Sequence, residues 1–247
     1  MDGNGRWAEE HGLERVKGHC EGARAVRDTV ETAARMGIPH LTLYAFSVAN
    51  WSRPRTEVDT LMRLLVDFAK RERMDLRQNG ICVQVAGHVE DLPAVTRLAV
   101  RELVNSTRHG DRLTLTLALS YGGRRDIVDA ARALVAKVRA GELAPEAIDE
   151  AAFRAELTTS ALPDVDLLIR TGGESRISDF LLFEAAYAEL MFLPVMWPEF
   201  RPEHLVAAVE CYMGKERRFG LTSAQVRSQD QDVAQANSRV LRPVVGY

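Results

Sequence analysis

Apolar residues along the chain recur in two spacings, one typical of helices and one typical of buried strands. Ala23, Val26 and Val30 follow the helical spacing, and Gly37 supplies a left-handed stop, which predicts a helix over residues 21–36. Short apolar runs bounded by turn residues predict strands at residues 41–46, 81–86, 113–119 and 165–170. Helical spacing elsewhere predicts helices at residues 56–80, 92–108, 126–140, 146–157, 180–187 and 202–217. This alternation predicts an α/β fold, a single domain with a mostly parallel central sheet covered by helices.

The composition fits a folded protein that has no general attraction for nucleic acid. Of the 247 residues, 46% are hydrophobic, which is enough for a packed core, and the formal net charge is -3. Individual arginines must therefore hold any anionic ligand, and we expect no nucleic-acid partner. The three cysteines form no zinc-binding pattern and no run of about eighteen apolar residues occurs, so we expect a cytoplasmic protein. Residues 223–246 are polar and weakly patterned, which predicts a tail.

Four polar segments fall at the ends of predicted strands. They are residues 2–7, 47–53, 121–126 and 170–178. In a parallel sheet covered by helices, ligands bind beyond the carboxyl ends of the strands. The coincidence predicts one active site built from these segments.

Residues 2–7 have the features of a phosphate-binding loop. Two glycines let backbone N–H groups approach an anion closely, and Arg6 and Arg15 add positive charge. A plain glycine turn is the alternative, because a Gly-x-Gly pair alone is a weak signal. Asp2 favours the phosphate loop, since a carboxylate there repels an anion unless a cation such as Mg²⁺ bridges the two.

Residues 170–178 also combine glycines with arginines, and this combination predicts a second anion site of diphosphate size. Arg170, Arg176 and Ser178 surround two glycines between a predicted strand and a predicted helix. Arg170 ends an apolar run, so an ordinary surface ion pair is a poor explanation for an arginine at this position. Glu189 follows the next predicted helix and is either a second metal ligand or a solvated helix end.

The loop at residues 47–54 carries an amide, an indole and a cation that could contact a substrate. These side chains belong to Asn50, Trp51 and Arg53. A tryptophan is more often part of the core, and His19 likewise has a structural role as its default interpretation.

Seven motifs, in order along the chain, resemble those of the undecaprenyl diphosphate synthase family of cis-prenyltransferases. They are MDGNGRWA, GH-x-x-G, YAFS with NW-x-RP, SYGGR-x-DI, DLLIRTGGE-x-R-x-S, YAEL and ERRFG. The resemblance implies a catalytic domain over residues 1–220, a tail over residues 221–247 and an apolar tunnel for the growing product. It also implies a homodimer, Mg²⁺ as cofactor, and isopentenyl diphosphate and an allylic diphosphate as substrates. The DDxxD motif of trans-prenyltransferases is absent.

The resemblance also implies roles for residues that match the family's motifs. Asp2 would be the metal-linked catalytic aspartate, Asn50 would act in proton removal, and Glu189 would be the second metal-site carboxylate. The implied substrate-binding residues are Gly3, Asn4, Gly5, Arg6, Trp7, Arg15, His19, Ser47, Val48, Ala49, Trp51, Arg53, Arg170, Arg176, Ile177, Ser178, Arg218 and Gly220. The segment with Arg218 and Gly220 would reach the active site of a partner subunit.

The chain departs from the family pattern at four points. Ala49 stands where the family usually has glutamate, and Ser175 stands at a variable position that is often histidine. Asp179 replaces an asparagine, and its negative charge would weaken diphosphate binding nearby. Family members also carry an apolar strand before the residue that matches Asp2. We therefore expect either a start further upstream or a poorly active truncation.

Three functions are open at this point. The first is an active enzyme that makes a long-chain polyprenyl diphosphate, such as undecaprenyl diphosphate, from farnesyl diphosphate, and that contacts the inner face of the membrane transiently through this lipid product. The second is a non-catalytic or impaired subunit of a cis-prenyltransferase complex. The third, a nucleotide phosphatase or kinase, lacks a GxxxxGK[ST] motif and a nucleophile with a paired base. The presence of two anion sites favours the first function, while product length and primer stay open.

Overall fold

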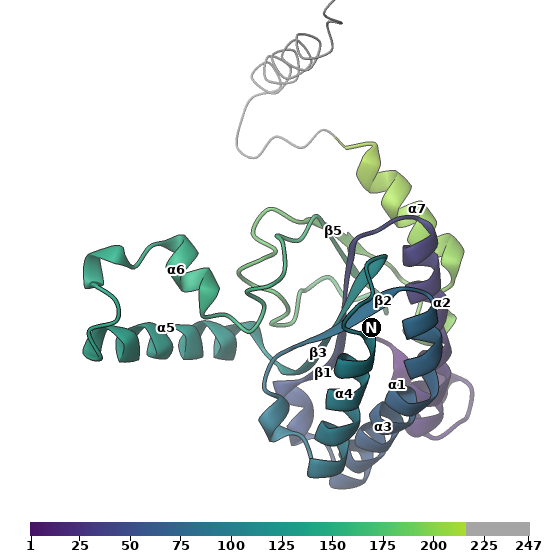
Figure 1. The fold of residues 1–247 in the computed structure, drawn as a ribbon. Coiled ribbons are helices and arrows are strands. Elements are labelled where there is room, and N and C mark those ends of the chain that lie inside the picture. Colours follow the sequence, from purple (N-terminus) through teal and green to yellow (C-terminus); the bar gives the residue numbers. More distant parts are fainter. Residues whose placement is uncertain (216–247) are drawn as a thin grey trace, which may run out of the picture. The chain divides into compact units, whose positions relative to one another are not determined.

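The structure, a computed structural model, describes residues 1–215. Contacts within the chain divide it into the units Met1–Val209 and Glu210–Tyr247. The strands of the described residues all belong to the first unit, which carries the candidate site (Figure 1). Arg218, Gly220, the end of the helix predicted at residues 202–217 and the predicted tail lie outside the described residues.

All strand pairings within residues 1–215 are parallel. A three-stranded sheet has the order β1–β3–β2, formed by β1 (His40–Ser47), β3 (Leu113–Tyr121) and β2 (Ile81–Ala86). A two-stranded sheet pairs β4 (Leu167–Arg170) with β5 (Glu189–Phe192). The predicted α/β fold is confirmed, although the strands form two separate ladders and not one continuous sheet.

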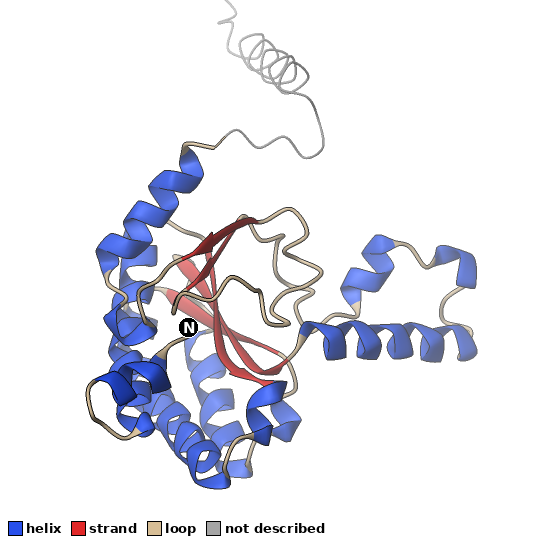
Figure 2. Ribbon diagram, turned by 180° about the vertical axis from the view of Figure 1, so that it is seen from behind, coloured by secondary structure: helices blue, strands red, loops and turns tan. Residues whose placement is uncertain are grey.

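Helices of two kinds surround these strands (Figure 2). The α-helices are α1 (Asn4–Glu10), α2 (Arg15–Arg35), α3 (Arg55–Gln78), α4 (Ala94–Thr107), α5 (Gly123–Arg139), α6 (Glu150–Ala155) and α7 (Pro202–Met213). The short 3₁₀ helices are η1 (Val48–Ser52), η2 (Val89–Asp91), η3 (Pro145–Ala147) and η4 (Trp197–Glu199). Helices α2, α3 and α4 pack against the three-stranded sheet, while α5 and α6 extend away from it (Figures 1 and 2).

The centre of the core is strand β3. Leu115, Leu117 and Leu119 are buried, as are the residues that alternate with them toward the end of the strand. Burial on both faces is expected of a central parallel strand covered by helices, and it explains the near-continuous apolar run in the sequence. The strand ends in Ser120 and Tyr121, directly before α5 begins.

The structure adds a strand that was not predicted, β5, and the short helix η1 in the loop predicted at residues 47–54. It also differs from the predicted elements at residues 180–187 and 2–7. The helix predicted at residues 180–187 is a series of turns, because Ser178, Asp179 and Leu181 have left-handed backbone angles (φ 52°, 64° and 47°) that a right-handed helix excludes. The loop predicted at residues 2–7 instead contains the start of α1, which begins at Asn4.

Helices α1 and α2 approach each other at a glycine. A Cβ atom added at Gly18 of α2 would lie 1.8 Å from the backbone carbonyl oxygen of Asn4 in α1. A contact this close to backbone atoms admits no side chain without movement of one helix. Gly18 therefore sets how closely the segment that contains Asp2 and Arg6 lies against α2.

Gly18→Ala tests whether this contact positions α1. Alanine favours a helix interior over glycine by about 1 kcal/mol, so helix propensity alone predicts a stabilised protein. The contact predicts the opposite, a loss of about 1–3 kcal/mol in the free energy of unfolding, because α1 must move off α2. Urea unfolding measures this change. The control is Gly214→Ala, where the added Cβ meets no atom of residues 1–215 closer than 3.7 Å. Unchanged or increased stability of Gly18→Ala would contradict the contact.

Candidate active site

A cavity of about 240 Å³ opens between α2 and α3 on the face of β1 and β3. Its apolar lining comes from both helices and both strands, and comprises Ala23, Val26, Leu43, Ala45, Phe46, Leu61, Met62, Leu64, Leu65, Phe68, Leu117 and Leu119. Its polar lining comprises Asp2, Asn4, Arg6, Arg15, His19, Asn50 and Arg53, together with Gly3 and Gly5. The site therefore joins a hydrocarbon-compatible interior to a group of mostly basic side chains.

Backbone contacts fix Asp2 beside the end of strand β4. Its N–H donates to Thr171 Oγ1 at 2.9 Å, and Thr171 Oγ1 donates back to the carbonyl oxygen of Asp2 at 2.9 Å. The N–H of Trp197 donates to the same carbonyl oxygen at 2.9 Å. Thr171 directly follows β4, so the first polar segment and the fourth meet at one point of the fold.

The carboxylate of Asp2 lies between two arginines. Its Oδ2 accepts a hydrogen bond from Arg170 at 2.8 Å, and its Oδ1 lies 3.5 Å from an Arg6 nitrogen. Burial alone would raise the pKa of Asp2, but hydrogen bonds from Arg170 and the Gly3 N–H, with the two positive charges, hold it below its ordinary value. Asp2 is therefore an anion at neutral pH, with its charge balanced by the arginines.

Glu57 organises the first cation cluster, which we define as the cations Arg15 and Arg53 together with the imidazole of His19. One Glu57 oxygen lies 3.1 Å from Arg53 and 3.6 Å from His19 Nε2, and the other lies 3.7 Å from Arg15 Nε. Glu57 belongs to the first turn of α3, where the helix dipole favours an acid. Sequence reasoning missed this residue, because an acid in the first turn of a helix is ordinary and carries no separate signal.

His19 is neutral in this environment. Burial and the charges of Arg53 and Arg15 lower its pKa below the ordinary value of 6.5, and the opposing effect of Glu57 is smaller than their sum. His19 Nε2 and Asn4 Oδ1 are buried without a hydrogen-bond partner within the described residues. Buried polar atoms normally have partners, so these two atoms suit a polar ligand at the cavity.

Arg170, Arg176 and Ser178 form the second cation cluster. Arg170 donates to the backbone oxygen of Arg176 and to Ser178 Oγ, the latter at 2.6 Å. Gly172 has a left-handed φ of 84°, and a Cβ atom there would lie 2.8 Å from an Arg6 nitrogen. The lack of a side chain at Gly172 thus lets Arg6 lie against this loop, and Arg6 and Asp2 line the same cavity as the first cluster.

The substituted residue Asp179 has a structural role. Its Oδ1 accepts a hydrogen bond from the Arg124 N–H at 2.9 Å, and its carbonyl oxygen accepts from the Gly123 N–H at 2.8 Å. Both donors belong to the first turn of α5, where the helix dipole stabilises a negative charge. Asp179 is therefore engaged at a helix terminus, which reduces the repulsion that its charge was expected to exert on a diphosphate.

The loop with Asn50 is a short 3₁₀ helix with a reciprocal cap. The Ser47 N–H donates to Asn50 Oδ1 at 3.0 Å, and the Ser47 side chain accepts from the backbone N–H of Asn50. Of the residues predicted in this loop, Asn50 and Arg53 line the cavity, and Ser47, Val48, Ala49 and Trp51 do not.

The second cation cluster lies outside the cavity lining, and so do three further predicted residues. Trp7 stacks on His11, and its indole donates to Glu199 at 2.9 Å. Ile177 belongs to the loop of the second cluster and does not line the cavity. Glu189 begins β5 and pairs with Leu167, at the opposite end of the ladder from Arg170 and thus roughly 10 Å along the strand. Within one chain, the structure does not bring Glu189 to Asp2.

Sequence comparison identifies relatives over nearly the whole chain. A family model described as "Putative undecaprenyl diphosphate synthase" matches residues 1–220. An isoprenyl transferase of Geobacter sulfurreducens is 47% identical over 93% of this chain and 93% of the relative. A ditrans,polycis-undecaprenyl-diphosphate synthase ((2E,6E)-farnesyl-diphosphate specific) of Micrococcus luteus is 42% identical over 89% of this chain and 88% of the relative.

Solved structures share the fold. Lavandulyl diphosphate synthase from Lavandula x intermedia, in complex with dimethylallyl diphosphate, is similar with a TM-score of 0.86 and 36% identity, over 89% of this chain and 95% of that chain. A probable undecaprenyl diphosphate synthase from Campylobacter jejuni is similar with a TM-score of 0.73 and 28% identity, over 81% of this chain and 92% of that chain.

The depressed pKa of His19 leads to a prediction for NMR titration. The His19 ring signal, assigned with His19→Gln, should titrate below 6.5, and bound pyrophosphate should move the pKa upward by adding negative charge. Glu57→Gln should lower the pKa further, because it removes the group that raises it. Because the pKa of His19 is lower in the folded protein than in the unfolded chain, the unfolded chain binds more protons at pH values between the two pKa values. The contribution of His19 to the free energy of unfolding therefore decreases as the pH falls from 6.5 through the folded pKa. A His19 pKa at or above 6.5 in the free protein would contradict this account.

Proposed function

The chain belongs to the undecaprenyl diphosphate synthase family and is a cis-prenyltransferase, and we propose that it joins isopentenyl diphosphate to farnesyl diphosphate to make a long-chain polyprenyl diphosphate. One observation carries the proposal. Basic side chains and Asp2 line one part of an apolar cavity, and Asp2 accepts a hydrogen bond from Arg170 of the second cation cluster. An amphipathic diphosphate ester needs an apolar and a cationic region side by side, and condensation of two such esters needs two anion sites.

We assign the two clusters to the two substrates. The allylic diphosphate lies against the backbone of Gly3 and Gly5 and the first cation cluster, with its hydrocarbon in the cavity. The isopentenyl diphosphate lies against the second cation cluster, beside Ile177. Arginine guanidinium groups bind diphosphate oxygens through paired hydrogen bonds, which gives orientation as well as affinity.

The reaction then balances as follows. The double bond of the isopentenyl unit attacks the first carbon of the allylic substrate, the bond from that carbon to the diphosphate oxygen breaks, and a proton leaves the second carbon of the isopentenyl unit. The arginines stabilise the departing negative charge, and the fixed clusters hold the two reacting carbons close together. Asn50 at the cavity is our candidate for a hydrogen-bonding role during proton removal. The released diphosphate can carry the proton away.

Asp2 fits a role as one ligand of Mg²⁺. Its side chain is 37% exposed, and Mg²⁺ in phosphate-transfer sites commonly takes one or two carboxylates with phosphate oxygens and water. No group of three or more His, Cys, Asp or Glu side chains within residues 1–215 could hold a metal ion by itself. A diphosphate would therefore have to complete the site. When bound, Mg²⁺ supplies charge neutralisation for the leaving diphosphate.

The farnesyl primer and the long product rest on the names of relatives. The Micrococcus luteus relative is described as specific for farnesyl diphosphate, whereas the lavandulyl diphosphate synthase structure holds dimethylallyl diphosphate. One fold thus accommodates primers of different length. The apolar residues of α2, α3, β1 and β3 support the longer primer here, because they line the same cavity as the basic residues and suit a hydrocarbon chain.

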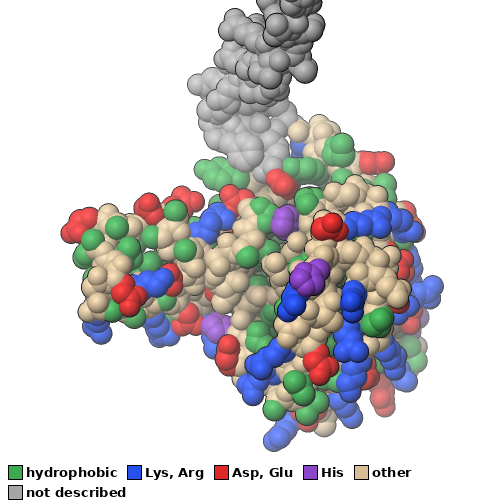
Figure 3. Space-filling model, viewed as in Figure 1, with side chains coloured by type: hydrophobic (Ala, Val, Ile, Leu, Met, Phe, Trp, Pro, Cys, Tyr) green, Lys and Arg blue, Asp and Glu red, His purple; other side chains and the backbone are tan. Residues whose placement is uncertain are grey.

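We also propose that the chain is a homodimer and that its product is released at a membrane surface. The α5 helix exposes Val128 (47%) and Val135 (51%), which lie about two turns apart on one side of the helix. Figure 3 shows hydrophobic side chains at the surface of the segment that extends from the rest of the molecule. A second copy packed there would cover them.

No helix within residues 1–215 has the length and apolarity needed to cross a membrane. A polyprenyl tail partitions into lipid, and the cytoplasmic face of the membrane is where we place its release.

The proposed function is tested with radiolabelled isopentenyl diphosphate, farnesyl diphosphate and Mg²⁺. Labelled products longer than the primer are expected. Asp2→Asn keeps the shape of the side chain but removes its charge, and should lower turnover at least about a hundredfold. Asp59→Asn, on an exposed side of α3, is the matched control and should leave turnover unchanged. Absence of labelled product from the folded parent protein would favour a non-catalytic subunit instead.

Product length should depend on Ala45, which lines the cavity from β1. Ala45→Leu adds three carbon atoms to a cavity of about 240 Å³ and should shift the product distribution toward shorter chains. Ala207→Leu on the exposed side of α7 makes the same change away from the cavity and should leave the distribution as it is. The products are separated by chain length after removal of the diphosphate. The same product lengths from Ala45→Leu and from the parent would show that the growing chain takes another path.

A further inference from the structure

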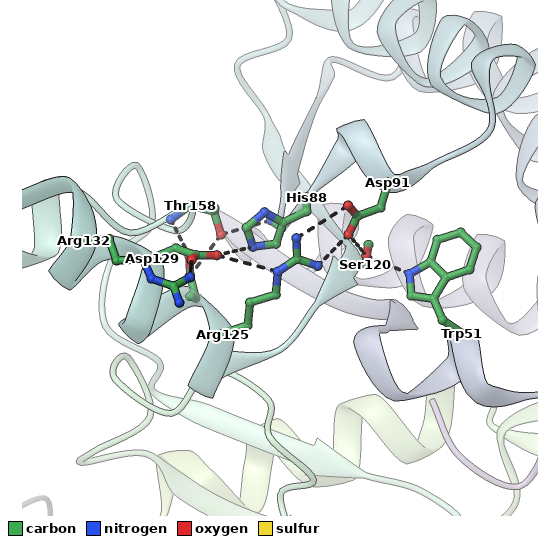
Figure 4. Close-up of polar contacts among 10 residues, drawn as sticks. Trp51, His88, Asp91, Ser120, Arg125, Asp129, Arg132 and Thr158 are labelled. Atoms are coloured by element: carbon green, nitrogen blue, oxygen red, sulfur yellow. Dashed lines mark hydrogen bonds and ion pairs between the residues drawn. The ribbon is translucent and has the colours of Figure 1, made fainter. Parts of the chain in front are cut away.

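A chain of hydrogen bonds lies next to the η1 segment and outside the cavity lining (Figure 4). The indole N–H of Trp51 donates to Ser120 Oγ at 2.9 Å, and Ser120 Oγ donates to Asp91 Oδ2 at 2.7 Å. Arg125 donates to the same Asp91 oxygen at 2.6 Å. The four residues belong to η1, the end of β3, η2 and α5, so the chain ties four elements together.

The direction of these bonds is fixed by chemistry. An indole N–H can only donate, so the Ser120 hydroxyl must accept from Trp51 and give its single proton to Asp91. Asp91 accepts from both Ser120 and Arg125 through its Oδ2 atom. Hydrogen bonding from Arg125 is the main reason that the pKa of Asp91 lies below its ordinary value, since it outweighs the effect of burial.

Ser120 is held in an unfavourable backbone conformation. It is fully buried, and its φ of 47° lies in the left-handed region that residues with a Cβ atom rarely adopt. Such strain persists only where surrounding contacts determine the conformation. The two hydrogen bonds of its hydroxyl are contacts of that kind, and they aim the hydroxyl between Trp51 and Asp91.

Trp51 connects this chain of bonds to the cavity. It directly follows Asn50 in η1, and its ring packs edge-on against Phe46 at a centroid distance of 4.8 Å. Both Asn50 and Phe46 line the cavity. Two other side-chain hydrogen bonds of η1, between Ser47 and Asn50 and between Ala49 and Ser52, join residues three positions apart. Within the described residues, the bond from Trp51 to Ser120 is the one that ties η1 to a distant part of the chain.

We propose that Asp91 and Ser120 are positioning residues that hold Asn50 at the cavity by fixing the Trp51 indole. The proposal rests on the role assigned above to Asn50. A shift of about 1 Å in a reacting or orienting group can cost roughly a hundredfold in rate. Loss of the Trp51–Ser120 hydrogen bond should therefore lower turnover measurably.

Indole NMR tests the structural half of the proposal without any substrate. Protein labelled with ¹⁵N-tryptophan gives indole N–H signals from Trp7, Trp51 and Trp197, and Trp51→Phe assigns the signal of Trp51. Asp91→Leu should move this signal and leave the other two in place. Asp164→Leu, which removes an exposed acid paired with Arg154, is the matched control and should move none of them.

Turnover tests the functional half. Asp91→Leu should lower kcat roughly ten- to a hundredfold while the KM for farnesyl diphosphate changes little, because the first cation cluster is untouched. Asp91→Asn keeps an oxygen that accepts from Ser120 and should recover most of the lost kcat. Ser120→Gly removes the hydroxyl and also relieves the backbone strain, so it provides a folded variant if Asp91→Leu is unstable.

The outcomes separate this proposal from the proposed function. An unmoved Trp51 signal in Asp91→Leu, or in Ser120→Gly, would overturn the positioning role whatever the activity. A moved signal with kcat unchanged would overturn the link to Asn50. If the parent protein made no product, the proposed function would fail, and the NMR signals would still decide whether Asp91 and Ser120 hold Trp51.

Discussion

The candidate site depends on the pairing of Asp2 with Arg170. Arg170 is only 12% exposed, and an arginine in that position without a partner would be costly. Asp2 alone beside a diphosphate would repel it. Their hydrogen bond at 2.8 Å pairs the two charges, and the Thr171 and Trp197 contacts hold Asp2 at that point. Under the proposed function, a diphosphate or metal ion bound here would compete for one partner of the pair and would change its charge balance.

Carboxylates near the site follow a common arrangement, in which each one orients a cation or a helix terminus. Glu57 gathers the first cation cluster, Asp91 holds Arg125 and Ser120, and Asp179 accepts from the first turn of α5. Each acid is thereby stabilised locally, which suits the proposed binding of two diphosphates. The net charge of the whole chain, -3, gives no indication of this local arrangement.

Much of the fold follows from local patterns, and the site follows from them only in part. The apolar runs predicted β1, β2 and β3, because buried parallel strands need continuous apolar sequence. The start of α1 was missed because a Gly-Asn-Gly sequence has low helix propensity and the helix is stabilised by packing on α2. Asp91 and Ser120 are 29 positions apart, and nothing local to either residue shows that they meet. The motifs pointed to Asp2 and Arg170, whereas Glu57 looked like any acid at the start of a helix.

A crystal structure with unreactive thiolo analogues of farnesyl diphosphate and isopentenyl diphosphate, soaked together with Mg²⁺, tests the central claim most directly. The account predicts one diphosphate at Arg15, His19 and Arg53, the other at Arg170, Arg176 and Ser178, and the farnesyl chain in the cavity beside Ala45. It also predicts that the 2.8 Å contact between Asp2 and Arg170 lengthens as the anions take its place. A farnesyl chain outside the cavity, or both anions bound with the Asp2–Arg170 contact unchanged, would contradict the account.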